Sequence, residues 1–317
     1  MKKRKFISPI ELWRLVRDSA IQFVDDRGTK LSAALAYYTI FSIPPLMIII
    51  ISIAGYFFGK EAITGQVYGQ ISGIVGSEAA AQIQDAIKQT VIDYNSWWAT
   101  IISIAALLLG ATGTFAEIQD SINLIWGLKA KPKKGLIKIV INRLISFSMI
   151  ITIGFLMLVS LLLNALLDIF NMQLQRLFPD VAYYAFYVFN IAFLLAVITT
   201  LFATVFKVLP DAKIKWKSVF YGALFTALLF SLGKVLISFY LGNSDIGTTY
   251  GTAGSVIIIL VWVYYSSIIL FYGAEFTQLY AQRFGTPIEP NDYAVFVAQK
   301  EVEVQDQSDA KQTTLVE

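Results

Sequence analysis

Long hydrophobic stretches alternate along this chain with short polar connections. The first stretch, residues 31–58, carries no charged side chain. A helix of about 20 apolar residues crosses the ~30 Å hydrocarbon layer of a bilayer, so this stretch predicts a transmembrane helix. Pro44 and Pro45 lie in its middle, where they remove two backbone N–H donors and clash with the preceding turn. We therefore expect a Pro-kinked first span that needs surrounding protein to satisfy the freed carbonyl groups.

Five further hydrophobic stretches predict five more spans. The expected transmembrane helices are 31–58, 97–126, 142–167, 183–208, 216–241 and 255–279. The pattern indicates an all-α integral membrane protein, in which a bundle of six transmembrane helices forms one domain over residues 31–280. Composition agrees, because 56% of the 317 residues are hydrophobic and 15% are charged, which is more apolar surface than one soluble core can bury.

Amphipathic segments lie on both sides of the first span. In residues 1–30, Ser8, Pro9 and Glu11 have the spacing of a capping box with proline at the first helical position. Apolar residues follow at three-to-four spacing, which predicts an amphipathic N-terminal helix on the membrane surface. Residues 59–96 carry two more amphipathic runs between glycines. They indicate an external loop that serves as a lid, as an interaction surface or only in packing.

Positive charges set the expected orientation. The connections on one side of the predicted membrane, together with both terminal segments, hold 21 Lys and Arg residues, and those on the other side hold three. Since positively charged connections stay in the cytoplasm, both termini are expected there. The tail, residues 281–317, combines prolines with scattered acidic residues and is expected to be largely disordered. The basic loop 129–134 predicts contact with anionic lipid head groups rather than nucleic acid, because no nucleic-acid-binding fold accompanies it.

Two acidic residues lie deep in predicted spans that both enter from the outside. Glu117 and Glu275 are each about 20 residues into their helices, so at about 1.5 Å per residue both are expected in one layer near the cytoplasmic boundary. Four basic residues are expected at the same depth and are available to pair with these acids: Arg27, Lys30, Arg143 and Lys207. The layer is then either a charge-paired clasp between helices or the lining of a polar cavity, and the sequence leaves both open.

Other polar residues extend these predicted faces. Asp120 continues the small, polar face of the second span, and Tyr264 lies on the polar face of the sixth. Lys234 lies in the outer half of the fifth span, so it either points into the bundle beside small residues or snorkels to the outer surface. The Gly-rich segment 242–254 that follows allows close approach of the backbone to a substrate or to another helix.

The chain has no histidine and no cysteine. Their absence removes Ser-His-Asp triads, Cys-His pairs and the imidazole and thiolate ligands of most metal sites. It also has no glycine-rich nucleotide-binding loop of the Walker type. We therefore expect a protein that is not an enzyme and that has no catalytic residues, no metal site and no cofactor.

Several short motifs, in this order, resemble the YihY/BrkB family of bacterial multi-pass inner-membrane proteins. They are AALAYYT at 33–39, SIPP at 42–45, FAE at 115–117, INLIW at 122–126, LP at 209–210, YGTAG at 250–254, WVY at 262–264 and GAE at 273–275. The resemblance implies a six-helix protein of the bacterial inner membrane. It also implies that ten positions matter for function: Tyr38, Ser42, Pro44, Pro45, Glu117, Asn123, Tyr250, Gly251, Gly254 and Glu275.

Members of that family have carried three labels: a transfer-RNA-processing ribonuclease, a serum-resistance factor and a transporter. The ribonuclease label conflicts with this sequence, because metal-dependent phosphodiesterases of the usual His/Asp type need ligands that this chain lacks.

Two functions remain. The first is a transporter or exporter of a small polar or lipid-like molecule through a polar-lined helix bundle. The second is a non-transporting envelope scaffold that binds a partner. The kinked span, the Gly-rich segment and the inward ionisable groups favour the first, since transporters use broken helices at their sites. Arg143, Asp120, Lys234 and Tyr264 join the ten positions above as candidates for the polar pathway or the helix clasp. Membrane lipids are the expected partners, and the sequence leaves homo-oligomer formation open.

Overall fold

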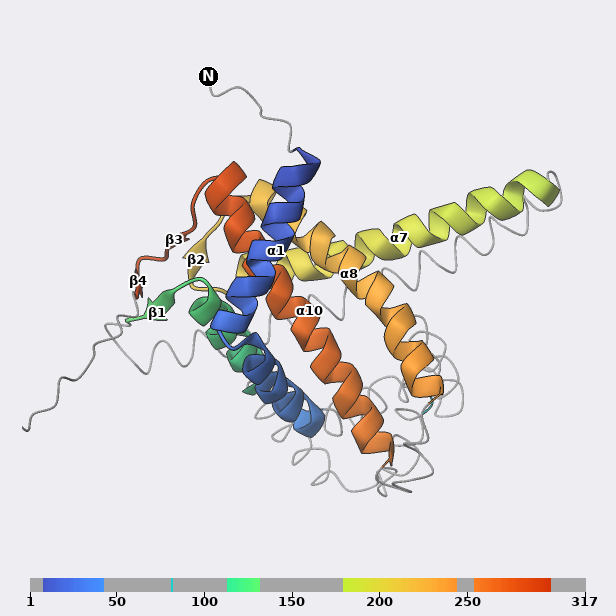
Figure 1. The fold of residues 1–317 in the computed structure, drawn as a ribbon, viewed down its shortest axis with the longest axis horizontal. Coiled ribbons are helices and arrows are strands. Elements are labelled where there is room, and N and C mark those ends of the chain that lie inside the picture. The colour runs from blue at the N-terminus through green and yellow to red at the C-terminus, as the bar shows by residue number, and fades with distance from the viewer. Residues whose placement is uncertain (1–7, 43–80, 82–112, 132–178, 244–253, 298–317) are drawn as a thin grey trace, which may run out of the picture.

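The computed structural model describes residues 8–42, 81, 113–131, 179–243 and 254–297, and these residues are mostly helical (Figure 1). Several predictions concern segments outside this part of the chain: the third span 142–167, the external loop 59–96, and the end of the tail beyond residue 297. The candidate residues Pro44, Pro45, Arg143, Tyr250 and Gly251 also lie outside the described residues.

Three of the described helices are long and apolar enough to cross a membrane. They are α7 (Pro179–Val208), α8 (Trp216–Gly242) and α10 (Gly254–Phe284), with candidate spans Val188–Val208, Trp216–Leu241 and Val256–Phe284. They fall on the predicted spans 183–208, 216–241 and 255–279. Helical residues 28–42 and 113–125 occupy parts of the predicted first and second spans.

The N-terminal helix α1 (Pro9–Asp25) begins with the expected capping box. The Ser8 hydroxyl accepts a hydrogen bond from the Ile10 backbone N–H, and the Glu11 carboxylate accepts one from the Ser8 N–H at 3.0 Å. These bonds satisfy donors that the first helical turn leaves free. After α1, Arg27 adopts a left-handed φ of 56°, and the chain turns into helical residues 28–42.

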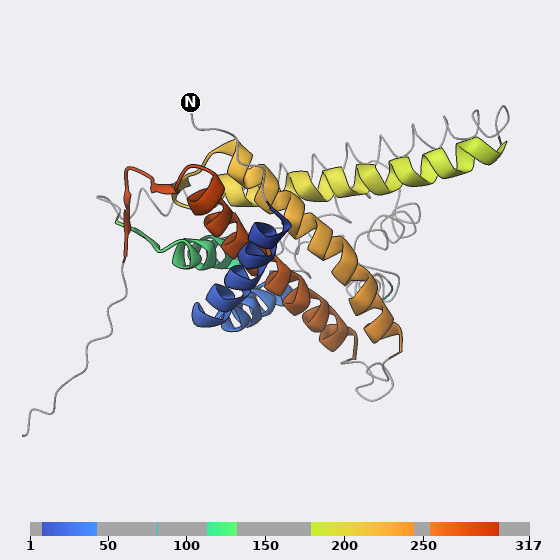
Figure 2. The ribbon, with the colours of Figure 1, turned by 45° about the horizontal axis from the view of Figure 1, so that its top comes forward.

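Helices α8 and α10 pack antiparallel along a close seam (Figures 1 and 2). Gly222 on α8 faces Thr277 on α10, and Gly273 on α10 faces Thr226 on α8, so that a Cβ atom at either glycine would overlap the facing threonine hydroxyl. Each threonine donates this hydroxyl to a carbonyl of its own helix. Because the hydroxyls are satisfied locally and the glycines lack side chains, the two backbones approach closely without burying an unpaired polar group.

The other helices add to this pair. The C-terminal half of α7 packs on α8, and the N-terminal half of α7 points away from the bundle (Figures 1 and 2). Helix α1 packs across the C-terminal half of α10, where Leu15 joins a cluster with Phe276, Leu279 and Tyr280. The main hydrophobic cluster lies where α7, α8, α10 and residues 122–128 meet, and its largest fully buried side chains include Trp126, Phe206 and Phe271.

Four short strands correct the all-α prediction. Strand β1 (Leu128–Ala130) pairs antiparallel with β4 (Ala294–Phe296), and β2 (Ala212–Lys213) pairs antiparallel with β3 (Glu289–Pro290). We call the end of the bundle where they lie the strand end. It is the end that the sequence predicts to be cytoplasmic.

The strands also correct the prediction for the start of the tail. The sixth span was expected to end at residue 279 and a largely disordered tail to begin at 281, but α10 continues to Phe284 and residues 289–296 form β3 and β4. Ile288 and Ala294 are buried there. The ordering comes from pairing with loops far away in the sequence, which local composition does not reveal.

Candidate functional site

At the strand end, residues 113–126 are fastened to α10. The indole of Trp126 is buried in the main cluster, and its Nε1–H donates to the Ala274 carbonyl oxygen at 3.1 Å. A buried Trp ring supplies a large apolar contact, and this bond satisfies its one polar atom. The residue after Ala274 is Glu275, so the anchor fixes the α10 backbone next to the predicted acid.

Asp211 lies at the centre of a buried hydrogen-bond network. Its Oδ1 accepts from the Gln119 amide at 2.9 Å, and its Oδ2 accepts from the Asn123 amide at 3.0 Å. In return, the Asn123 side-chain oxygen accepts from the Asp211 backbone N–H at 2.8 Å. The Asp211 side chain is 1% exposed. Donors to both carboxylate oxygens offset much of the cost of removing this group from water.

The network also holds the C-terminal segment. The Asp211 carbonyl oxygen accepts from the Asn291 N–H at 3.0 Å. Burial and the nearby Asp211 charge raise the pKa of the Tyr293 hydroxyl. Asp211 therefore links three segments: the helix 113–125, the loop between α7 and α8, and the tail.

Sequence reasoning identified Asn123 but missed Asp211 and Gln119. Two signals were present in the sequence. Gln119 and Asn123 are four residues apart, so they share one helix face, and Asp211 is the one acid in an otherwise basic connection between two spans.

Glu275 has a different environment. Its side chain is 0% exposed, and neither carboxylate oxygen has a cationic or amide donor among the described residues; the carboxyl of Asp26 lies within hydrogen-bonding reach. The charges that act on it come from Asp26 and Asp25, at the end of α1, and both are negative. Burial raises the pKa of Asp26 as well. On the same helix, the Gln22 side-chain oxygen is also buried without a donor in the described part of the chain.

The basic residues predicted to lie near Glu275 do not contact it in the described part of the chain. Lys207 donates its ammonium to the Ile214 carbonyl oxygen and lies 5.7 Å from the centre of the Trp216 ring. Arg27 is exposed, in the turn after α1. Neither Arg27 nor Lys207 therefore pairs with Glu275 in the part of the chain that the structure describes. Depth along a helix does not determine the direction of long side chains, which here reach toward a carbonyl and solvent.

Glu117 is partly buried, and its carboxylate accepts a long hydrogen bond, 3.4 Å, from Ser121 on the same helix. No ion pair joins it to Arg27 or Lys207 among the described residues. Asp120, one turn along, is exposed. No described contact joins Glu117 to Glu275, so their common layer stays a prediction.

The remaining candidates are spread over the bundle. Ser42 and Thr114 share a hydrogen bond at 2.9 Å, which brings the first and second predicted spans together. Tyr38 lies beside Gly113 at the same contact. Lys234 and Tyr264 are partly buried on α8 and α10, and Gly254 is buried at the start of α10. None of these residues has a described contact with Glu275.

Comparison with known proteins identifies relatives over most of the chain. A family profile described as Virulence factor BrkB matches residues 20–294. The ribonuclease-like protein YfkH of Bacillus subtilis is 26% identical over 271 residues, which cover 83% of this chain and 93% of YfkH. No solved structure matches this chain.

Two other relatives are UPF0761 membrane proteins. The one from Saccharophagus degradans is 26% identical over 268 residues, and the one from Xanthomonas campestris is 25% identical over 269. Each match covers 83% of this chain and 58% of the relative, so the chain spans a little over half of their length. The profile match over most of the sequence, with helices apolar enough to span a bilayer, shows that the chain belongs to the BrkB family of membrane proteins.

Proposed function

We propose that this protein is a cation-coupled transporter of a small polar or lipid-like molecule, with Glu275 as the residue that binds the coupling cation. The observation that carries the proposal is the fully buried Glu275 carboxylate between α1 and α10, whose hydrogen-bonding neighbour is a second acid, Asp26, and which has no cationic or amide donor among the described residues.

The surroundings of Glu275 contain acceptors rather than donors. Asp26 contributes further oxygen atoms at the end of α1, and Asp25 adds another negative charge. An ionised carboxylate removed from water without a partner costs several kcal/mol, so such a group persists where something positive compensates it. Intramembrane acids of this kind mark ion and proton pathways. A proton and Na⁺ are the candidate cations.

The proposed site favours a monovalent cation over a divalent metal. No group of three or more acidic side chains that could hold a metal ion occurs in the described part of the chain. Glu275 and Asp26 supply at most two negative charges, and Asp25 is exposed. Divalent metals generally require more carboxylate or carbonyl ligands.

The scaffold alternative is favoured by the Asp211 network. Its carboxylate is satisfied by two amides, and it ties together three distant segments. Such a network stabilises one arrangement of the chain, as a scaffold requires. A scaffold would have no use for an uncompensated acid at Glu275.

The test is solid-supported-membrane electrophysiology on proteoliposomes, with jumps in proton or Na⁺ concentration. We expect the wild-type protein to give a transient current with one of the two ions. The variant Glu275→Gln keeps the shape of the side chain and should lose most of this current. Asp292→Asn, which changes an exposed acid, is the matched control and should keep it.

Two results would overturn the proposal. One is a wild-type protein that gives no current with either ion. The other is a Glu275→Gln variant with wild-type current. Thermal unfolding in detergent is measured on the same preparations, so that loss of current is read only from folded protein.

A further inference from the structure

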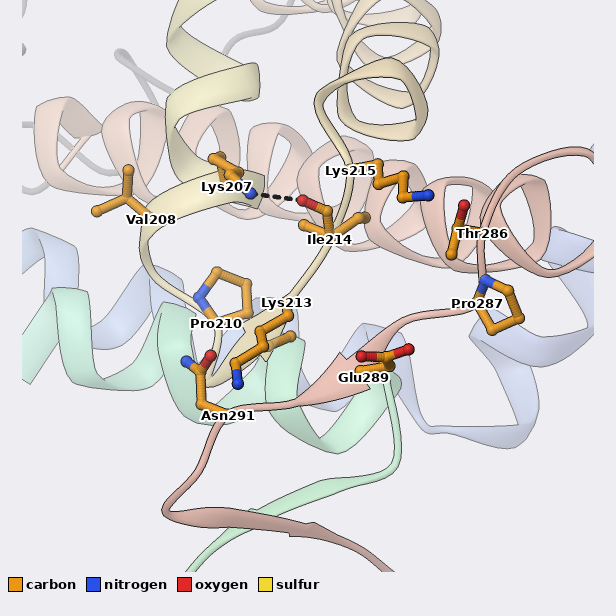
Figure 3. Close-up of a pocket in the computed structure, with 11 residues that line it drawn as sticks. Lys207, Val208, Pro210, Lys213, Ile214, Lys215, Thr286, Pro287, Glu289 and Asn291 are labelled. Atoms are coloured by element: carbon orange, nitrogen blue, oxygen red, sulfur yellow. Dashed lines mark hydrogen bonds between the residues drawn. The ribbon is translucent and has the colours of Figure 1, made fainter.

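A basic pocket of about 420 Å³ lies at the strand end, between the end of α7, the start of α8 and the segment after α10 (Figure 3). Three lysines line it: Lys207, Lys213 and Lys215. Glu289 is the acidic residue of the lining. The pocket therefore has a net positive charge, and it is separate from Glu275.

The three lysines differ in how firmly they are held. The Lys207 ammonium group donates a hydrogen bond to the Ile214 carbonyl oxygen (Figure 3). It also lies over the Trp216 ring, so its position is fixed. An ammonium group has three N–H donors, which leaves two for a ligand. Lys213 pairs with Asp292, an exposed ion pair of the weak kind. Lys215 is exposed, and its side chain extends toward Thr286 (Figure 3).

The pocket lies where two candidate spans meet water. The first ends at Val208 and the second begins at Trp216, so residues 209–215 are expected at the level of the lipid head groups. Trp216 is 63% exposed and Phe220 is 52% exposed. Exposed aromatic residues beside lysines are typical of a membrane interface, where rings contact acyl chains and cations contact phosphates.

We propose that this pocket binds the phosphate group of an anionic phospholipid through Lys207 and Lys215. The basic loops predict anionic-lipid contact in general, and the structure gives it a defined cavity with a fixed cation. The proposal is independent of transport, because a lipid bound here requires no movement through the bundle.

The test measures binding of short-chain phosphatidylglycerol to the purified full-length protein by native mass spectrometry. Phosphatidylcholine of the same chain length and glycerol 3-phosphate are the comparison ligands. We expect tighter binding of phosphatidylglycerol than of either. The double variant Lys207→Gln/Lys215→Gln should weaken phosphatidylglycerol binding by about tenfold or more, since each lysine near an anionic lipid contributes to the binding free energy.

Lys217→Gln is the matched control. Lys217 is exposed in the first turn of α8 but does not line the pocket, so this variant should bind phosphatidylglycerol nearly as well as the wild type. Equal binding by the double variant and the wild type would overturn the proposal. So would glycerol 3-phosphate binding as tightly as the lipid, because the pocket would then take a soluble phosphate. The single variant Lys215→Gln, which removes an exposed side chain, keeps the test valid if loss of Lys207 prevents folding.

Discussion

Asp211 and Glu275 are both acids buried from solvent in this bundle, with exposures of 1% and 0%. Two side-chain amides donate to the Asp211 carboxylate, whereas Glu275 has no amide or cationic donor among the described residues and has acidic neighbours, of which Asp26 is within hydrogen-bonding reach. Removing a buried acid that accepts hydrogen bonds leaves its donors unpaired and lowers stability. Removing a buried acid without such donors removes a desolvation penalty from the folded state. The comparison therefore separates a residue that holds the structure from one kept for another reason.

The largest expected effect is on Asp211. Replacing it with alanine strands the amide groups of Gln119 and Asn123 in a buried position, so the free energy of unfolding should fall by about 3–5 kcal/mol. Thermal or denaturant unfolding in detergent measures this. The milder Asp211→Asn variant should also lower the free energy of unfolding, because the amide replaces one acceptor oxygen with a donor that faces other donors. A change within about 0.5 kcal/mol for both variants would remove the distinction from Glu275.

A second, smaller effect concerns the seam between α8 and α10, the helix on which Glu275 lies. In Gly273→Ala, the new methyl group would overlap the Thr226 hydroxyl, and we expect a loss of about 1–3 kcal/mol. Adding Thr226→Ala removes the overlapping hydroxyl and should recover part of this loss. The pair should therefore be non-additive in a double-mutant cycle. Full additivity of the two changes in unfolding free energy would mean that residues 226 and 273 do not contact each other.

The third prediction concerns Glu275 itself. Glu275→Gln should leave the free energy of unfolding unchanged or raise it by about 1 kcal/mol, because a neutral amide costs less to bury than an unpaired carboxylate. Unfolding measured beside Asp211→Asn gives the sharpest contrast, since both variants change an acid into its amide. A loss above about 2 kcal/mol would show that Glu275 has a stabilising partner and would end the comparison.

The smallest effect is expected from the exposed ion pair between Asp18 on α1 and Arg283 on α10. Hydrogen bonds from Arg283 and Arg17 lower the pKa of the Asp18 carboxyl below its ordinary value of 3.8. A lowered folded-state pKa means that the stabilisation is present above the unfolded pKa and is lost as the pH falls through the folded one. Asp18→Asn should thus be slightly less stable than the wild type at neutral pH.

The pH and salt dependence of this last variant identify its cause. The difference from the wild type should vanish well below pH 3.8 and shrink in high salt, because the pair is exposed and screened. A difference that persists in acid would assign the effect to packing between α1 and α10 instead of to charge.

Much of the described fold follows from local sequence patterns. Hydrophobic length placed three spans close to α7, α8 and α10, and the Ser8, Pro9 and Glu11 spacing placed the start of α1. These signals are local, because a membrane span or a capped helix is specified within about one helix length. The sequence did not identify the seam glycines, because a glycine in a span can serve several purposes and the residue that faces it cannot be read from the sequence.

The candidate site was predicted only in part. Asn123 and Glu275 were identified through their motif context, but the partners of both were not. The Asp211 network joins residues separated by 88 and 92 positions, and no periodicity within either segment records that contact. Lys207 was expected beside an acid and instead bonds to a backbone carbonyl seven residues away.

The sequence by itself determined that the chain is a mostly helical membrane protein, where several of its spans lie, and which residue types are absent from its chemistry. These properties depend on hydrophobic length, charge bias and composition, which can be summed over residues without knowing their contacts. Only the tertiary structure decided which buried acid is satisfied and which is not, and that the tail pairs with distant loops. The free energy of a buried polar group depends on the atoms within about 3 Å of it. In this protein those atoms come from segments far apart in the sequence.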